Sequence, residues 1–305
     1  MKTLKSIVAL LMLLLVAMTT QAQENDFPKL IGPYLGQKPP GELPEVFARN
    51  IFPDGLGYGG FVFSNKGDEV FFFAVDNREH YKVMYSSIQE GYWQPPVRIK
   101  ETKYNQVHPF YSPEGDKIFF GSDMPVKGNA KVPYFNIWFI KRTNVGWCEP
   151  EPINNTINSG FENCGTFNNS GLFLVRRISP QSRGDIYISS YSNGLFEKPV
   201  KMPPEINTAF DESHPAISQD GSCLLFSSKR PGGFNKGRDD LWICFRKEGK
   251  WTKATNMGKL INNGSNTSCA TISPDGKYIF FVRIENGVGI PYWVSAKFIE
   301  KLKQQ

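Results

Sequence analysis

SPDGKYIFF, at residues 273–281, decides the fold, because four related phrases occur earlier in the sequence. Each is a polar turn around a glycine followed by an apolar, aromatic-rich run, which is typical of a tight turn leading into a buried strand. The other copies are SNKGDEVFF at 64–72, SPEGDKIFF at 112–120, NNSGLFLV at 168–175 and SQDGSCLLF at 218–226. Their glycines lie 48, 56, 50 and 55 residues apart. Self-similarity at such a period predicts a repeat architecture.

The repeats share more than the turn. A strand-like segment precedes each glycine, as in HPFYS and HPAIS, and a second strand follows it. A third strand comes after a variable loop, as in NIWFIK and DLWICF. The first four repeats then continue through a glycine–aromatic turn into a closing strand. Four antiparallel strands per unit, repeated five times, predict an all-β fold, a five-bladed β-propeller.

The fifth repeat stops after its third strand, and the missing strand is available near the start of the chain. PEVFARNIF, at residues 44–52, resembles the closing segments of the other repeats. Pairing it with residues 292–296 would close the ring and remove an exposed sheet edge. We therefore expect a propeller over residues 44–305, preceded by an irregular Gly- and Pro-rich arm over 23–43.

The first 22 residues have the pattern of a signal peptide. Lys2 and Lys5 precede an apolar stretch over 7–18, and Thr20-Gln21-Ala22 provides small residues for cleavage. The rest of the sequence has no apolar stretch of membrane length, so we expect an exported protein, periplasmic or secreted, with no transmembrane segment after cleavage. The net charge of +6 comes without a dense Lys/Arg stripe, which argues against nucleic acid as a partner.

Five cysteines in an exported chain raise the question of disulfides. The number is odd, and the spacing matches no small disulfide scaffold. Cys148, Cys223 and Cys244 lie in strand-like runs, where a free cysteine behaves as a small hydrophobic residue. The sequence therefore predicts at most one disulfide.

SPDGKYIFF, HPAISQDG and SSKRPGGFNKGRDDLW resemble the WD-repeat-like propeller family that includes bacterial TolB. The resemblance covers all five repeats, roughly residues 47–302, although the third turn reads NNSG and no Trp-Asp dipeptide is present. The resemblance implies a propeller fold and does not select one function, since blades of this family occur in binding proteins, in scaffolds of protein complexes and beside enzyme domains. The segment ending in Gln-Ala-Gln is similar to the signals of exported proteins of Gram-negative bacteria.

Aligning the repeats on their turns brings five residues to one level of the innermost strands, next to the central axis. They are Gly60, His108, Cys164, His214 and Cys269. Histidine and cysteine are the donors that zinc prefers, so His108, Cys164, His214 and Cys269 are candidate zinc ligands. The alternatives are histidines that order the incoming loops, cysteines that are simply small, or a disulfide between Cys164 and Cys269. A structural role without a bound cofactor is our working expectation.

Acidic residues lie just before or after strands near the axis. Glu162, Asp211 and Glu212 precede the innermost strands of repeats three and four, and Asp123 ends the second strand of repeat two. Because glycoside cleavage needs two carboxylates at a set separation, Glu162, Asp211 and Asp123 are the candidate catalytic set of a glycoside hydrolase. The alternative is that the acids bind loop amides and pair with nearby arginines, namely Arg177, Arg230 and Arg283.

Two long loops, residues 122–136 and 227–240, are expected on one face of the ring. Both mix basic residues, glycines and an aromatic, a composition suited to recognition of a partner. Our leading hypothesis is an exported binding or scaffolding propeller that recognises a protein, peptide or glycan on this face. A carbohydrate-active enzyme is the alternative. The candidate ligand-binding residues are His108, His214, Arg177, Arg230, Phe234, Lys236, Arg238 and Arg283.

Overall fold

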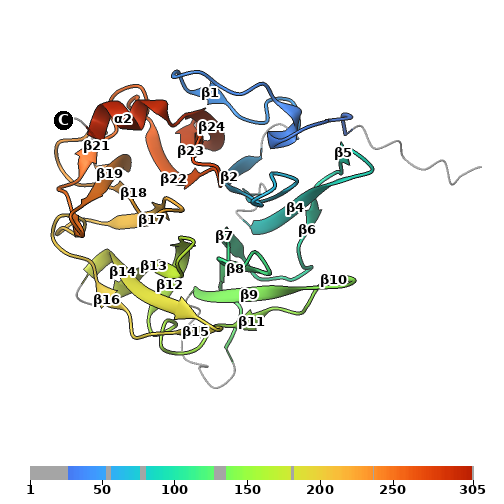
Figure 1. Cartoon of the computed structure of the whole chain (residues 1–305), viewed down its shortest axis with the longest axis horizontal. Helices are drawn as coiled ribbons and strands as arrows, with labels where there is room; N and C mark the ends of the chain where they lie inside the picture. Colours follow the sequence, from blue (N-terminus) through green and yellow to red (C-terminus); the bar gives the residue numbers. More distant parts are fainter. Residues whose placement is uncertain are drawn as a thin grey trace, which may run out of the picture.

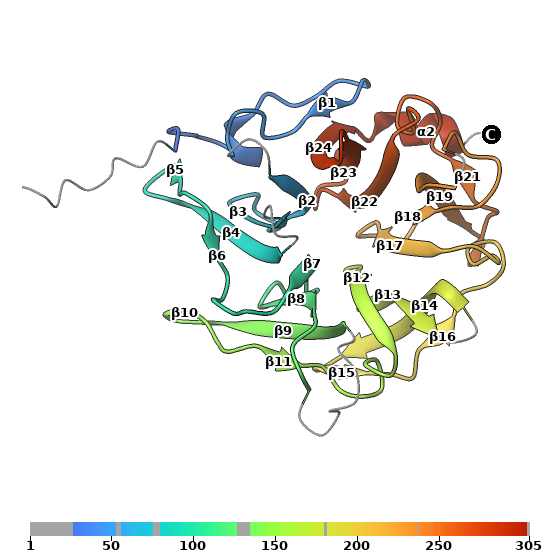
Figure 2. The same cartoon turned by 180° about the vertical axis from the view of Figure 1, so that it is seen from behind.

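Five antiparallel sheets are arranged around a central axis in the computed structural model (Figures 1 and 2). The structure describes residues 27–52, 56–75, 80–126, 135–179, 182–235 and 237–303. This arrangement confirms the predicted five-bladed β-propeller. The expected signal peptide, residues 1–22, lies outside the described residues. Within the described residues, the structure has no helix with the length and apolar character needed to cross a membrane.

Each blade starts with its innermost strand and ends at the rim of the ring. Blade 1 contains β2 (Gly57–Phe63), β3 (Glu69–Val75), β4 (Tyr81–Gln89), β5 (Tyr92–Trp93) and β6 (Val97–Arg98). Blade 2 contains β7 (Gln106–Tyr111), β8 (Lys117–Ser122), β9 (Asn136–Thr143), β10 (Gly146–Trp147) and β11 (Glu151–Pro152). Blade 3 contains β12 (Phe161–Phe167), β13 (Leu172–Ser179), β14 (Ser182–Ser192), β15 (Leu195–Phe196) and β16 (Val200–Lys201). Blade 4 contains β17 (Glu212–Ile217), β18 (Cys223–Ser228), β19 (Asp240–Lys247), β20 (Lys250–Trp251) and β21 (Thr255–Asn256). Blade 5 contains β22 (Asn266–Ile272), β23 (Tyr278–Glu285), β24 (Val288–Ser295) and β1 (Glu45–Val46).

The fourth strand of blades 1–4 is divided into two short pieces that pair with the same third strand. In blade 1, β5 pairs with the end of β4, and β6 pairs with its middle. Pro95 and Pro96 lie between the two pieces, with Pro150 and Pro199 between the pieces of blades 2 and 3. Proline has no backbone N–H to donate to a sheet, so it interrupts the ladder at the rim.

The N-terminal strand closes the ring, as predicted. Glu45 pairs with Trp293 and Val46 with Tyr292, and the N–H of Phe47 donates to the carbonyl of Pro291 at 2.9 Å. The strand is shorter than the expected segment 44–52, because left-handed backbone at Ala48 (φ 57°) and Asn50 (φ 60°) turns the chain away from β24. In Figure 1, β1 lies beside β24 at the outside of the ring.

One apolar cluster lies at each of the five blade interfaces, and these clusters form the core. Adjacent side chains of a second strand point to opposite faces, so Phe119 packs toward blade 3 and Phe120 toward blade 1. Both faces of each blade are therefore buried, which explains the unbroken apolar runs of the repeated phrase. The arm before β1 contributes Tyr34 and Leu35, from the 3-10 turn η1 (Tyr34–Gly36), to the cluster between blades 5 and 1.

Buried asparagines fasten the closing strands of three blades. Asn158 accepts from the N–H of Ile137 at 2.8 Å and donates to its carbonyl at 2.9 Å. Asn207 makes the same pair of bonds with Ile186, and Asn262 makes it with Leu241. Each of these asparagines follows an isoleucine in the sequence (Ile157, Ile206 and Ile261), so this repeated dipeptide has a structural role. At the C-terminus, α2 (Lys297–Lys303) packs Ile299 against blades 4 and 5.

Candidate functional site

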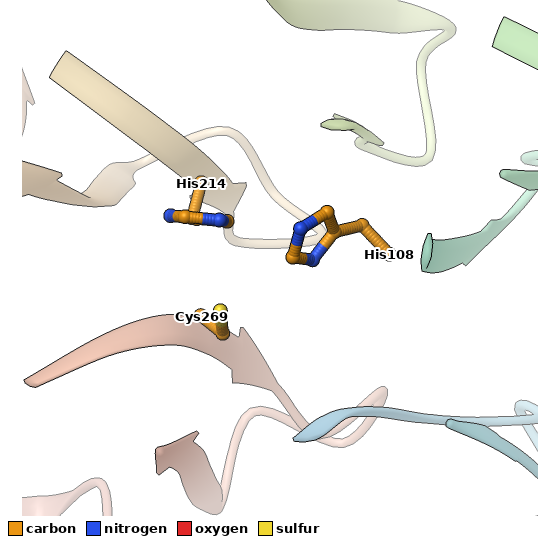
Figure 3. Close-up of side chains that lie close together, drawn as sticks. All are labelled: His108, His214 and Cys269. Atoms are coloured by element: carbon orange, nitrogen blue, oxygen red, sulfur yellow. The ribbon is translucent and has the colours of Figure 1, made fainter. Parts of the chain in front are cut away.

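His108, His214 and Cys269 meet on the axis of the propeller. They lie on β7, β17 and β22, and Figure 3 shows their side chains projecting into the same space. One potential ligand atom from each residue lies within 4.8 Å of the other two. The two imidazole rings are in edge contact, with centroids 4.5 Å apart. Cys164 also lies near the axis and is 3% exposed, but it is not part of this group.

A bulge in each innermost strand turns these side chains toward the axis. In all five blades the pairing register between the first and second strands shifts partway along the first strand, for example between Val107 and Phe110. His108, His214 and Cys269 lie at the bulge with φ angles of 49°, 50° and 54°. Blade 1 has Gly60 there, with φ 62°. A bulge re-aims a side chain, which is how three strands direct theirs to one point.

The three residues separate two pockets along the axis, since they line both. We call the side with the five glycine turns the turn face and the opposite side, with the long loops, the loop face. On the turn face lies a narrow cavity of about 100 Å³. On the loop face a wider pocket of about 460 Å³, the loop-face pocket, opens between blades 1 and 5.

Burial keeps both imidazoles neutral and the thiols protonated. It lowers the pKa of His214 to about 3, and Arg176 and Lys229 act in the same direction. The pKa of His108 is also well below its ordinary value, first through burial and then through His214 and Arg176. Burial raises the pKa of Cys269 to about 12. At neutral pH the axis therefore carries uncharged nitrogen and sulfur donors.

A charged cluster beside His214 was not foreseen as a unit from the sequence. The guanidinium of Arg176 pairs with Asp211 at 2.9 Å, and Lys229 lies 3.6 Å from the other oxygen of that carboxylate. Burial raises the pKa of Asp239 to about 6, while Lys229 lowers it and Asp211 raises it. The sequence contained one signal for this cluster, namely Arg176. It is charged, whereas the residues at the matching positions of blades 4 and 5 are Ser227 and Val282.

Asp239→Asn is expected to remove part of the pH dependence of stability. Because the folded pKa of Asp239 is raised, the folded protein binds this proton more tightly than the unfolded chain. Stability therefore falls as pH rises from about 4 to 6. With about 1.4 kcal/mol per pKa unit, the effect is about 1–3 kcal/mol. Urea unfolding between pH 4 and 8 measures the effect. The free energy of unfolding of the wild type should fall relative to that of the variant as pH rises. A difference in this free energy that stays constant contradicts the raised pKa of Asp239.

Two acidic residues near the axis, Glu162 and Glu212, form buried ion pairs with arginines. Glu162 is fully buried and accepts from Nε of Arg177 at 2.6 Å. Glu212 is fully buried, lies 3.1 Å from Arg230, and also accepts from Thr208. Burial raises the pKa of Glu162, which Arg177 opposes. This arrangement favours the structural alternative over a catalytic role for Glu162.

The three arginines repeat one pattern in successive blades. Each stacks on an aromatic ring of the third strand of its own blade, and each donates to a carbonyl of the loop that enters the blade. Arg177 donates to Ile157 at 2.8 Å, and Arg283 donates to Leu260 at 2.6 Å. Arg230 donates to Ile206. The aromatic partners are Tyr187, Trp242 and Tyr292. These guanidinium groups already stack on rings and donate hydrogen bonds within the protein, which favours a structural role over ligand binding.

The remaining candidates lie in more exposed places. Asp123 accepts two hydrogen bonds of 2.7 Å from Asn105, so it orders the loop that enters β7. In the loop before β19, Phe234 is 49% exposed and Arg238 is exposed. Asp240 anchors the base of this loop by accepting from the N–H of Phe234 at 2.6 Å. Lys236 lies outside the described residues, as does most of the long loop of blade 2, residues 127–134.

The five cysteines are free, so the structure contains no disulfide between Cys164 and Cys269. Burial raises the pKa of Cys164 to about 11. Cys223 and Cys244 are buried in the apolar cores of blade 4, as expected for small hydrophobic residues.

Comparisons with known proteins are informative at the level of the fold. No family model matches the sequence, and no curated protein matches it. TolB from Acinetobacter baumannii is similar over 79% of this chain and 54% of its own, with 12% identity and a TM-score of 0.50. The putative TolB from Agrobacterium tumefaciens is similar over 76% of this chain and 71% of its own, with 14% identity and a TM-score of 0.50. A protein of unknown function from Dyadobacter fermentans has 14% identity and a TM-score of 0.49, covering 84% of this chain and 82% of its own.

The chain thus spans about half the length of the Acinetobacter TolB. Because the identities are below 25%, these likenesses concern architecture and carry no activity. Together with the ring of five sheets, the two TolB structures lead to one conclusion: the protein is a five-bladed β-propeller with a TolB-like fold.

Proposed function

We propose that this protein is an exported, non-catalytic propeller that binds a peptide segment of a partner protein on its loop face. The observation that carries the proposal is the loop-face pocket of about 460 Å³ at the axis. Its volume lies within the usual range for ligand sites. The export part of the proposal rests on the signal-like sequence at residues 1–22.

The chemistry of the pocket suits an apolar or aromatic side chain of a peptide. Phe73, Val75, Val282 and Ile284 form apolar walls, and the hairpin turn at 286–287 lies at the pocket's blade-5 side. The rest of the lining includes Tyr58, Tyr81, Ser268, the axial residues and three glycines, and the glycines expose backbone groups to an extended chain. The glycines are Gly57, Gly287 and Gly289.

Exposed apolar side chains on the same face support a protein partner. Phe210, Phe234 and Leu260 lie in loops that enter or connect strands on the loop face and are 40%, 49% and 59% exposed. Arg238 follows Phe234 by four residues in the same loop and is also exposed. Exposed aromatic residues next to arginine are common among the residues that dominate protein interfaces.

Val288→Trp is expected to weaken peptide binding at least 10-fold, because a large side chain on this lining residue fills the loop-face pocket. The measurement starts with peptides selected on the purified protein from a displayed random library and follows their affinity by fluorescence polarisation. Val145→Trp is the matched control, since Val145 is 98% exposed in the turn between β9 and β10 at the rim.

Equal affinities of the two variants would contradict the assigned site. Selective binding on a glycan array, without peptide enrichment, would replace the peptide by a carbohydrate. Glycoside cleavage that is lost in Glu162→Gln, with the fold intact, would establish the enzyme alternative and overturn the proposal.

A further inference from the structure

We propose that His108, His214 and Cys269 bind a divalent transition-metal ion, with zinc as the preferred metal. The three donors come from blades 2, 4 and 5, and their ligand atoms lie within 4.8 Å of one another on the axis (Figure 3). Within the described part of the chain, this is the one group of three or more potential ligands in such proximity. The inference goes beyond the proposed peptide binding and does not depend on it.

The donor atoms are free to bind an ion. Nδ1 of His214 lies 3.0 Å from the hydroxyl of Ser213, and Nε2 makes no hydrogen bond with the residues that the structure describes. A hydrogen bond to one ring nitrogen fixes the orientation in which the other nitrogen coordinates a metal. The ring of His108 makes no hydrogen bond within the described chain, and the thiol of Cys269 has Ser268 at 3.6 Å. An ion at this point would give these donor atoms a partner that the described residues do not provide.

The backbone at these positions supports a role for the side chains. His108, His214 and Cys269 have φ angles of 49°, 50° and 54°, a left-handed conformation that is unfavourable for residues with a Cβ. The equivalent bulge position in blade 1 is Gly60, which has φ 62°. Backbone strain of this kind concentrates at functional sites. Three strained residues that converge on one point are explained if their side chains are needed there.

The geometry is within reach of a tetrahedral site. Zinc–nitrogen bonds of about 2.0 Å and zinc–sulfur bonds of about 2.3 Å place ligand atoms about 3.3–3.5 Å apart. The present separations of up to 4.8 Å therefore require movements of about 1 Å, which side-chain rotation supplies. The fourth position is open to the pockets on both sides of the group, because the same three residues line both. Three protein ligands and one open position is a known arrangement for zinc.

The charges around the axis do not exclude a cation. Arg176 and Lys229 bring two positive charges near His214, and Asp211 pairs with both of them. Asp239 adds a second carboxylate to the same cluster. The cluster is therefore close to neutral when Asp239 is ionised. Zinc binding would release the thiol proton of Cys269 to solvent. The resulting donors, two imidazoles and a thiolate, select zinc over calcium or magnesium, which prefer oxygen.

The test is metal titration of the chelator-treated full chain under reducing conditions. Competition with a chromophoric chelator should show one equivalent of Zn²⁺ bound, and Mg²⁺ should not compete. Cobalt(II) in place of zinc should give a thiolate-to-cobalt charge-transfer band together with the strong visible bands of tetrahedral cobalt. His108→Gly, His214→Gly and Cys269→Ser should each lower zinc affinity at least 100-fold. Cys269→Ser should also abolish the charge-transfer band.

Two matched controls keep the test specific. His80→Ala and Cys148→Ser remove a histidine and a cysteine that are not part of the axial group, and both should bind zinc as the wild type does. His108→Gly also distinguishes the loss of a metal ligand from a loss of stability. Glycine adopts the left-handed backbone of this position without strain, so the variant is expected to fold. Without metal its Tm should equal or exceed that of the wild type. Zinc binding below a tenth of an equivalent, or binding unchanged in the axial variants, overturns the proposal.

Discussion

Glu212→Gln is expected to lower the free energy of unfolding by about 3 kcal/mol. Glu212 is fully buried, and the side chain of Arg230 is 9% exposed, so the guanidinium would remain in the interior without its counter-charge. Glutamine keeps the shape and part of the hydrogen bonding to Thr208 and Ser228, so the loss isolates the missing charge. Urea denaturation at neutral pH, followed by tryptophan fluorescence, measures the effect.

Glu114→Gln is the control for this prediction, because Glu114 is exposed in a glycine turn and its change should stay within about 0.5 kcal/mol. The double variant Glu212→Gln/Arg230→Met should be more stable than Glu212→Gln alone, because it no longer buries an unpaired charge. Equal losses for Glu212→Gln and Glu114→Gln would refute a buried, paired Glu212.

Phe47→Ala should destabilise the protein by about 3–5 kcal/mol, the usual range for removing a buried phenylalanine. Phe47 is 1% exposed and joins the two ends of the propeller. Its ring centroid lies 5.0 Å from that of Phe61 in blade 1 and 4.9 Å from that of Phe280 in blade 5. The variant therefore opens a cavity at the seam where the ring closes. Denaturant unfolding of variant and wild type gives the difference.

Leu43→Ala is the matched control in the same part of the chain. Leu43 is 64% exposed and is expected to contribute little. If Phe47→Ala lowers the free energy of unfolding no more than Leu43→Ala does, the N-terminal segment does not hold the ring closed.

The architecture could be predicted from the sequence because each blade repeats one physical pattern. The glycine turns marked five hairpins, and paired aromatics such as Phe119–Phe120 indicated strands buried on both faces. The absence of a fourth strand in the last repeat pointed to the pairing of Val46 with Tyr292. The division of the fourth strands was missed. Prolines accompany it in blades 1–3, but blade 4 has Thr252, Lys253 and Ala254 between its two pieces, so the position of proline alone does not predict it.

The candidate site could be predicted in part. Aligning the repeats correctly placed His108, His214 and Cys269 together, since equivalent positions of a ring meet at its axis. The same alignment did not show that Cys164 stays outside the group of three. It also left open whether Glu162 and Glu212 were free or paired. Their pairing with Arg177 and Arg230 depends on side-chain direction and burial, which a single sequence does not specify.

The pairing of β1 with β24 has a consequence for the order in which the protein is made. Glu45 leaves the ribosome 248 residues (293 − 45) before its partner Trp293. At about 5–20 residues per second, this is a wait of roughly 12–50 s. During synthesis the first blade therefore stands without the neighbour that later covers it. The circle can be completed only after the last strand has emerged, so the two ends of the propeller pair late in assembly.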